Sequence, residues 1–243
     1  MANPYFRFKQ FTVYHDRCAM KVTTDACLFG AWTAETINNE QLATGDKRFL
    51  DVGTGTGLLS LMVAQKNNGK IDAVEIDAGA AVQAAENIKS SPWQDAIQVI
   101  QQDVLQWQQK TKYDVILSNP PFYENEIRSE TEEKNVAHHG EGLRLEELLL
   151  FIKRNIKEDG TFFLLLPAKR KSEMERLMRK QELYAEKLVM VQQTQRHQPF
   201  RIMLQGRCQK VNEICESLIS IKNSEDAYTP EFISLLKSYY LYL

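Results

Sequence analysis

The sequence predicts an α/β domain with a mostly parallel central sheet, and two observations support this prediction. Between residues 47 and 166, short apolar runs alternate with segments of helical periodicity, as in parallel sheets whose strands are joined by crossover helices. Beyond this region, two long runs of β-forming residues are joined by a short turn, which favours an antiparallel C-terminal hairpin at the sheet edge. We therefore expect a seven-stranded sheet in a single compact unit over residues 46–243, preceded by a short N-terminal extension over residues 1–45.

The expected strands are short runs rich in β-branched, aromatic and leucine residues. Several are apolar along most of their length, which is typical of strands buried on both faces of a parallel sheet. In chain order they are Arg48–Val52, Ile71–Glu75, Ile97–Gln101, Tyr113–Ser118 and Thr161–Leu166, followed by the hairpin strands Leu183–Thr194 and Phe200–Arg207.

Helices are expected between these strands, where apolar residues recur at helical spacing. They are Leu58–Lys66, the alanine-rich segment from Asp77 to about Ser90, and the amphipathic segment Leu143–Ile156. A terminal helix should start near Thr229, a suitable N-cap that is followed by Pro230 at the first helical position. In the N-terminal extension, residues 23–34 should form a helix capped by Thr23 or Thr24, which we expect to act as a lid.

Composition and charge argue against several classes of protein. With 43% hydrophobic and 26% charged residues, the chain is typical of globular domains, and no apolar run approaches the ~18 residues of a membrane span. The four cysteines lack the spacing of metal ligands, which predicts reduced thiols in a cytoplasmic protein without a metal site. A net charge of −2 argues against indiscriminate binding of nucleic acid. We expect a monomer.

A glycine-rich loop, Asp51-Val52-Gly53-Thr54-Gly55-Thr56-Gly57, lies between the first parallel strand and its helix. Glycines at this position let the backbone turn tightly and approach a ligand at the helix N-terminus. The dinucleotide-binding pattern G-x-G-x-x-G would need its third glycine at position 58, which is Leu58. The observed G-x-G-x-G spacing favours the loop of S-adenosylmethionine-dependent methyltransferases, with Asp51, Gly53, Thr54, Gly55 and Gly57 as candidate cofactor-binding residues.

Two acidic residues at the ends of the next strands fit the same cofactor. Glu75 ends the second strand, where a carboxylate accepts hydrogen bonds from the two ribose hydroxyls. Asp103 follows the third strand, where a carboxylate can reach the amino group of adenine. Each acid alone can be a simple cap, but the three features in this order predict S-adenosyl-L-methionine as the cofactor.

The fourth strand ends in Ser118-Asn119-Pro120-Pro121-Phe122. Neither proline has an N–H for a sheet ladder, so the pair terminates the strand and fixes the backbone that follows. The side-chain oxygen of Asn119 and the carbonyl of Pro120 are two acceptors for an amino group conjugated to a planar ring, and Phe122 offers a face for stacking. We expect Asn119, Pro120, Pro121 and Phe122 to form the catalytic tip, with Asn119 also near the cofactor. The alternative is a rigid turn without a chemical role.

The Asn-Pro-Pro-aromatic tip resembles the signature of methyltransferases that act on amino groups conjugated to a planar system. These enzymes include DNA, rRNA and tRNA adenine N6-methyltransferases and the release-factor glutamine N5-methyltransferases. The motif alone does not choose among these substrates. The glutamine enzymes usually carry a helical domain before the sheet and Tyr after the two prolines, whereas this chain has a short extension and Phe122. A catalytically silent RNA-binding module is a further hypothesis, which the intact glycine loop and Asn119 disfavour.

The N-terminal segment favours one of these substrates by resemblance. Phe8-Lys9-Gln10-Phe11, His15-Asp16 and residues 20–32 (Met-Lys-Val-Thr-Thr-Asp-Ala-Cys-Leu-Phe-Gly-Ala-Trp) resemble the signature of a family that methylates N6 of adenosine 37 in a valine tRNA. The resemblance extends through Asp51–Gly57, Asn119–Phe122 and Tyr228–Leu243, and it implies a Rossmann-like class I methyltransferase fold. Relatives usually have Gly where this chain has Thr23, and Thr would be strained there if the backbone φ were positive.

Two residues of this segment are further candidates for cofactor binding. Lys21 and Asp25 are placed to touch the charged carboxylate and ammonium of the methionine end. The alternative is a helix whose polar first turn is only capped. The alternating aromatic and polar residues of Phe6–Phe11 suit either a nucleic-acid surface or a half-buried strand.

The charge distribution predicts where the substrate binds. Residues 167–211 hold eleven Lys and Arg against four Asp and Glu, and such a face can bind phosphates even on a weakly acidic chain. We expect tRNA to be held there by Lys169, Arg170, Lys171, Arg176, Arg196 and Arg201, against the alternative of a solvated surface. The segment Tyr123–Leu143 is expected to be a substrate loop, and its His138 and His139 lack a cluster of further ligands that would support a metal site.

Overall fold

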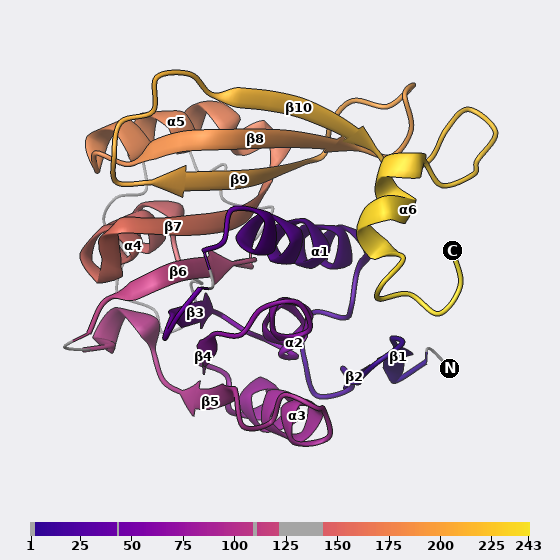
Figure 1. The fold of residues 1–243 in the computed structure, drawn as a ribbon, viewed down its shortest axis with the longest axis horizontal. Coiled ribbons are helices and arrows are strands. Elements are labelled where there is room, and N and C mark those ends of the chain that lie inside the picture. The colour runs from indigo at the N-terminus through magenta and orange to yellow at the C-terminus, as the bar shows by residue number, and fades with distance from the viewer. Residues whose placement is uncertain (1–2, 43, 109–110, 122–142) are drawn as a thin grey trace, which may run out of the picture.

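A computed structural model describes residues 3–42, 44–108, 111–121 and 143–243 of the chain. Its centre is an eight-stranded sheet in the order β10-β8-β9-β7-β6-β3-β4-β5, with helices on both faces (Figure 1). The strands are β3 Arg48–Val52, β4 Lys70–Glu75, β5 Ile97–Gln101, β6 Tyr113–Ser118, β7 Ile156–Pro167, β8 Tyr184–Gln192, β9 Arg201–Arg207 and β10 Cys215–Ser220. The helices are α1 Thr24–Asn39, α2 Leu58–Ala64, α3 Ala78–Lys89, α4 Leu145–Asn155, α5 Lys171–Lys180 and α6 Pro230–Leu236, with the 3-10 turns η1 Val104–Gln106 and η2 Ala168–Arg170.

The sheet confirms the predicted α/β architecture and contains one strand more than the seven expected. Strands β3 to β7 run parallel, and β9 is antiparallel to both β7 and β8, which is the predicted hairpin. The additional strand, β10, pairs in parallel with the outer edge of β8. Its side chains are mostly exposed and mix polar with apolar groups. The sequence therefore lacks the strict alternation that would predict this strand.

Successive residues of the central strands serve opposite faces of the sheet. On β7, Phe163 and Leu165 pack in the hydrophobic cluster with α1, α2 and α6, while Phe162 and Leu164 pack with α4 and α5. All four side chains are buried. The apolar run that predicted a central strand is therefore shared between two hydrophobic layers.

The N-terminal extension packs into the first of these layers. Strands β1 (Tyr5–Arg7) and β2 (Thr12–Tyr14) form an antiparallel hairpin. Phe8 and Phe11, between the two strands, are buried and stack with their ring centroids 4.5 Å apart. These contacts support the interpretation of Phe6–Phe11 as a half-buried segment. The N–H of Lys9 donates to the carbonyl of Tyr239 at 2.8 Å, so the first and last segments of the chain are neighbours.

Helix α1 continues to Asn39, beyond the predicted end at residue 34. It approaches α2 closely at Gly30, where a Cβ would lie 2.7 Å from the sulfur of Met62. Thr23 is the N-cap residue, with an extended φ of −119°, and its side chain makes no capping hydrogen bond. Thr is therefore unstrained at the position where relatives were expected to have Gly.

Candidate active site

The predicted site residues that the structure describes follow parallel strands ending at one edge of the sheet: the glycine loop follows β3, Glu75 ends β4, Asp103 follows β5 and Asn119 follows β6. In the backbone register, Val52 of β3 lies opposite Val74 of β4 and opposite Ser118 of β6. The loop after β3 therefore starts between Glu75 and Asn119. The chain goes on from β3 to β4 and from β6 to β7, in opposite directions along the sheet, and open α/β sheets bind ligands where the order reverses in this way.

Left-handed backbone conformations shape the glycine loop. Gly53, Gly55 and Gly57 have φ angles of 70°, 55° and 80°, at which a residue with a Cβ is strained. The N–H of Gly53 donates to the carbonyl of Val74 at 2.9 Å, which anchors the loop on β4. A Cβ added at Gly53 or Gly55 would have no heavy atom within 4 Å. The backbone of this loop therefore borders open space, as the close approach of a ligand requires.

Asp51 supports the loop from within the core. Its carboxylate is fully buried, and Oδ2 accepts hydrogen bonds from the hydroxyls of Thr54 at 2.6 Å and Ser60 at 2.7 Å. Burial raises the pKa of Asp51 to about 6, although these two hydrogen bonds lower it. Its Oδ1 has no hydrogen-bond partner among the described residues. The side chains of Asp51 and Thr54 therefore hold the shape of the loop.

Glu75 holds the loop from its β4 side. Its Oε2 accepts the N–H of Gly55 at 2.8 Å, and its Oε1 accepts the N–H of Asp77 at 3.0 Å. The residue is 9% exposed, so its carboxylate has one orientation at the strand end. Each carboxylate oxygen keeps a further lone pair for a ligand donor. This is the strand end at which the sequence predicts a ribose-binding acid.

Asp103 lies one strand further along the edge, two residues after the end of β5, and is the N-cap residue of η1. Its Oδ1 accepts the N–H of Leu105 at 2.9 Å, so in this structure the side chain caps η1. Two large apolar side chains close to these acids in the sequence are exposed. Ile76, next to Glu75, is 66% exposed, and Leu105, two residues after Asp103, is 51% exposed. Exposed apolar side chains beside polar acceptors suit the faces of a planar base.

Ile76 and Leu105 are not among the functional residues predicted from the sequence. An apolar residue at the end of a buried strand is ordinarily assigned to the core. The available signal was their position, one residue after Glu75 and two residues after Asp103.

The predicted catalytic tip is joined to β3 by a side chain as well as by the sheet ladder. The buried hydroxyl of Ser118 donates to the carbonyl of Val52 at 2.7 Å. Asn119 is partly buried, Pro120 is buried and Pro121 is exposed, so the chain leaves the sheet at the two prolines. Phe122 and the expected substrate loop as far as residue 142 lie outside the described residues.

Residues 14–25 connect the N-terminal hairpin to α1. At one end, Asn87 on α3 accepts the N–H of Tyr14 at 3.0 Å and donates to the carbonyl of Thr56 in the glycine loop at 2.9 Å. At the other end, Oδ2 of Asp25 pairs with Nε of Arg201 at 2.7 Å. Lys21 lies between these ends and is exposed. Of the two residues expected at the methionine end of the cofactor, Asp25 therefore already has a partner.

The six basic residues predicted to bind tRNA fall into two groups. Three of them form ion pairs, which are Arg170 with Glu173, Lys171 with Glu216, and Arg201 with Asp25. Lys169, Arg176 and Arg196 are exposed and form no ion pair within the described part of the chain. The second group can therefore meet a phosphate without first losing an acidic partner.

The described ranges contain neither a candidate metal site nor a candidate membrane span. They contain no group of three side chains that could hold a metal ion, and no helix long and apolar enough to cross a membrane. His138 and His139 lie outside these ranges.

The chain resembles known methyltransferases over its whole length. It matches the methyltransferase small domain family over residues 33–203. It is 38% identical to the tRNA1(Val) (adenine(37)-N6)-methyltransferase of Bacteroides thetaiotaomicron, covering 100% of both chains. It is 42% identical to the protein of the same name from Dyadobacter fermentans, covering 98% of each. Its fold is similar to that of a predicted O-methyltransferase from Agrobacterium tumefaciens, with a TM-score of 0.62 at 15% identity, covering 88% of this chain and 96% of that one.

Proposed function

The chain belongs to the tRNA1(Val) (adenine(37)-N6)-methyltransferase family, and we propose that it transfers a methyl group from S-adenosyl-L-methionine to N6 of an adenosine in tRNA. Position 37 of a valine tRNA is the proposed target, because the full-length relatives carry that name. The structural observation that carries the chemistry is the register of Val52 with Ser118. It brings the glycine loop and the Asn-Pro-Pro tip to neighbouring strand ends.

The residues at this edge fit S-adenosylmethionine, which supplies a methyl group on a positively charged sulfur when bound. The open space beside Gly53 and Gly55 admits a ligand against the backbone. We propose that the oriented carboxylate of Glu75 accepts hydrogen bonds from the ribose hydroxyls and that Asp103 accepts one from the adenine amino group. Ile76 and Leu105 then provide apolar contacts for the adenine ring.

Asn119 and Pro120 act on the target amino group in this proposal. The exocyclic nitrogen of adenine is a poor nucleophile because its lone pair is conjugated with the ring. The Asn119 side-chain oxygen and the Pro120 carbonyl accept its two N–H groups, which favours the state in which the lone pair attacks the methyl group. Pro120 and Pro121 fix the backbone, so little ordering entropy is lost at each turnover.

The target adenine must leave its stack to reach the tip. We propose that Phe122 then stacks on the extruded base. The extra proton on the methylated nitrogen is acidic, so the reaction needs no strong base at the site. This agrees with the acceptors that the tip offers, which are an amide oxygen and a peptide carbonyl.

We propose that Lys169 and Arg196 make the main phosphate contacts with tRNA, supported by Arg176 on α5. Lys169 lies in η2, which directly follows β7 at the sheet edge where the parallel strands end. The turn that contains Arg196 adjoins η2, because the N–H of Ala168 donates to the carbonyl of Phe200 at 3.0 Å. Arg170 and Lys171 contribute after exchanging their carboxylate partners, since exposed ion pairs are weak. We propose that the enzyme works as a monomer in the cytoplasm.

The test is methyl transfer from labelled S-adenosylmethionine to purified tRNA that lacks the modification. We expect label in valine tRNA, and N6-methyladenosine at position 37 when the product is digested and analysed by mass spectrometry. A valine tRNA transcript with guanosine at position 37 is the matched control and should remain unlabelled. Label in release factors or in rRNA, with none in tRNA, would contradict the proposal.

A further inference from the structure

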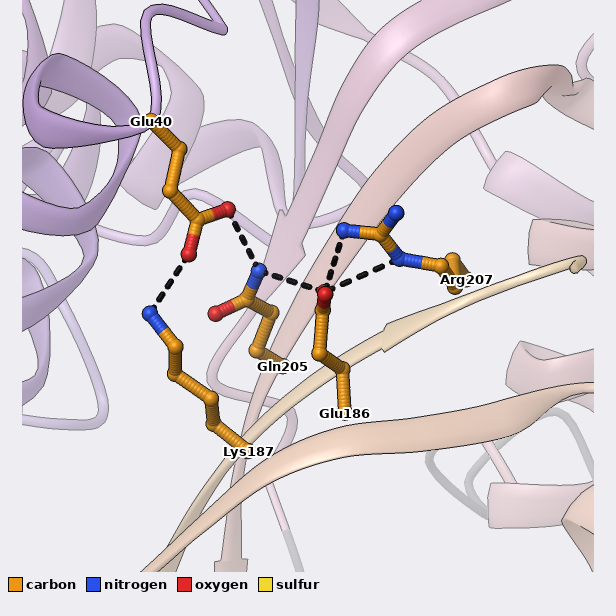
Figure 2. A network of polar contacts seen from close by, with 5 residues as sticks. All are labelled: Glu40, Glu186, Lys187, Gln205 and Arg207. Carbon is orange, nitrogen blue, oxygen red and sulfur yellow. Dashed lines mark hydrogen bonds and ion pairs between the residues drawn. The ribbon is translucent and has the colours of Figure 1, made fainter. Parts of the chain in front are cut away.

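Helix α1 is tied to the antiparallel strands β8 and β9 at its C-terminal end by a network of side chains (Figure 2). Glu40, directly after the helix, pairs with Lys187 of β8 and accepts a hydrogen bond from Gln205 of β9 at 2.8 Å. Gln205 also donates to Glu186, which pairs with Arg207. This end of α1 is therefore held by several side chains at once.

The N-terminal end of α1 is tied to β9 by the ion pair of Asp25 and Arg201. Asp25 lies in the first turn of the helix, and Arg201 is the first residue of the strand. Their side chains are 14% and 34% exposed, and the guanidinium also lies 5.6 Å from the ring centre of Phe200. Arg201 is opposite Pro167 in the backbone register, so this pair sits at the edge where β7 ends.

Residues 18–24, which we call the strap, connect this ion pair to the other side of the site. Before the strap, Arg17 pairs with Glu86 of α3 at 2.9 Å. A Cβ added at Gly79, in the first turn of α3, would lie 3.4 Å from the carbonyl oxygen of Arg17, so Cys18 follows beside the start of α3 and the end of β4. The strap thus starts beside the end of β4 and ends beside the start of β9.

The sheet order dictates what the strap passes. Strands β3, β6 and β7 lie between β4 and β9, a separation of about 19 Å at roughly 4.8 Å per strand. The strap bends at Cys18–Met20, and on its way from β4 to β9 it has to cross the ends of the strands between them, which include β3 before the glycine loop and β6 before Asn119.

The strap has few ties of its own. Its side chains make no hydrogen bond or ion pair with any described residue, and Ala19, Met20, Lys21, Thr23 and Thr24 are exposed. Val22 packs against the hydrophobic cluster that contains the core residues of α1 and α2, so the position of the strap depends on this contact and on the anchors at its two ends. We propose that Arg201 is a positioning residue for cofactor binding, which acts through Asp25 to hold the strap and Lys21 along the glycine loop.

This inference rests on the proposed cofactor and assigns Arg201 a role other than phosphate binding. The test is the affinity for S-adenosylmethionine, measured by calorimetry in the absence of tRNA, in Asp25→Ala, Arg201→Met and the double variant. Each single variant should bind the cofactor about tenfold more weakly, because it releases the strap. The double variant should bind no more weakly than the singles, since all three lose the same tie. The salt dependence of tRNA binding should stay the same in Arg201→Met.

Lys187→Met is the matched control, because it breaks an ion pair at the opposite end of the same helix. It should lower the unfolding temperature and leave the cofactor affinity unchanged. If Arg201→Met does not fold, Arg201→Lys keeps the charge without the Nε donor and should weaken cofactor binding in the same direction.

Three results would overturn the inference. They are unchanged cofactor affinity in a folded Arg201 variant, additive losses in the double variant, and an equal loss in Lys187→Met. If Asp25→Ala weakens cofactor binding while a folded Arg201 variant keeps full affinity, the first of these results is obtained. Asp25 would then bind the cofactor directly. Because tRNA is absent from the assay, failure to methylate tRNA leaves this test intact. Absence of cofactor binding in the unmodified protein would instead reject the proposed function.

Discussion

The buried hydroxyl of Ser118 donates a 2.7 Å hydrogen bond to the carbonyl of Val52, across the boundary between β6 and β3. Ser118 is the last strand residue before Asn119, and Val52 is the last before the glycine loop. This side chain and the sheet ladder together fix the proposed catalytic tip relative to the proposed cofactor site.

Ser118→Ala should lower kcat about tenfold, because the tip loses a support and a small misplacement of reacting groups is costly. The free energy of unfolding should fall by only about 1 kcal/mol, the net value of one hydrogen bond. Ser91→Ala is the matched control, since it removes a 2.8 Å hydrogen bond to the carbonyl of Ile88 beyond the far end of α3. It should cost similar stability without changing kcat in single-turnover assays. Equal rates for the two variants would contradict this role.

Asn119→Ala should lower kcat by about 10²- to 10³-fold, as expected for the loss of an acceptor that acts mainly in the transition state. The dissociation constants of S-adenosylmethionine and tRNA should change little. Single-turnover methylation with both ligands saturating separates the chemical step from binding. Methylation at the rate of the unmodified enzyme would exclude Asn119 from catalysis.

Glu75→Ala should weaken S-adenosylmethionine binding by about 1–3 kcal/mol, because it leaves two ribose hydroxyls without an acceptor. The loss includes a contribution from the glycine loop, since the N–H of Gly55 also loses its partner. Asp72→Ala, three residues earlier on β4, removes an ion pair with Arg48 and is the control. It should lower stability and leave cofactor affinity intact by calorimetry. If Glu75→Ala keeps full affinity, Glu75 does not bind the cofactor.

Asp51 predicts a pH dependence of stability. Burial raises its pKa from 3.8 to about 6, so the folded protein binds the proton more tightly than the unfolded chain does. The stability that this proton confers is complete below about pH 4 and is lost as the pH rises through about 6. In Asp51→Asn this titration is absent.

The difference in unfolding free energy between the unmodified protein and Asp51→Asn should therefore fall by up to about 3 kcal/mol between pH 4 and 6. Urea denaturation of both proteins at several pH values measures this difference. A constant difference over this range would show that the carboxyl titrates alike in the folded and unfolded states.

The strands that carry the site were predictable because their signals are local. The bounds of β3, β5 and β6 are those expected from the apolar runs. The glycines of Asp51–Gly57 have positive φ angles, which is why this loop needs them. The two prolines after Asn119 end β6 where their missing N–H groups require it.

The features that escaped prediction depend on partners distant in the chain. Asp25 and Arg201 are 176 residues apart, so neither helical nor strand periodicity indicates that they meet. Strand β10 is stabilised by pairing with the edge of β8, and its sequence lacks the apolar face that would predict a strand. The functional interest of Ile76 comes from its exposure, which only the folded structure reveals.

The ribosome synthesises the hairpin β1–β2 and helix α1 long before residues 238 and 239, which complete the same layer. The N–H of Lys9 donates to the carbonyl of Tyr239. The side-chain hydroxyl of Tyr239 donates to the carbonyl of Met62 in α2 at 2.9 Å. Gln65, which follows α2, donates to the carbonyl of Ser238 at 2.8 Å. A nascent chain that ends before residue 238 therefore lacks the contacts that seat α2 and the glycine loop at its start. We expect the ability to retain S-adenosylmethionine to arise only after residues 238 and 239 have left the ribosome, as a late folding event governed by contacts between distant parts of the chain.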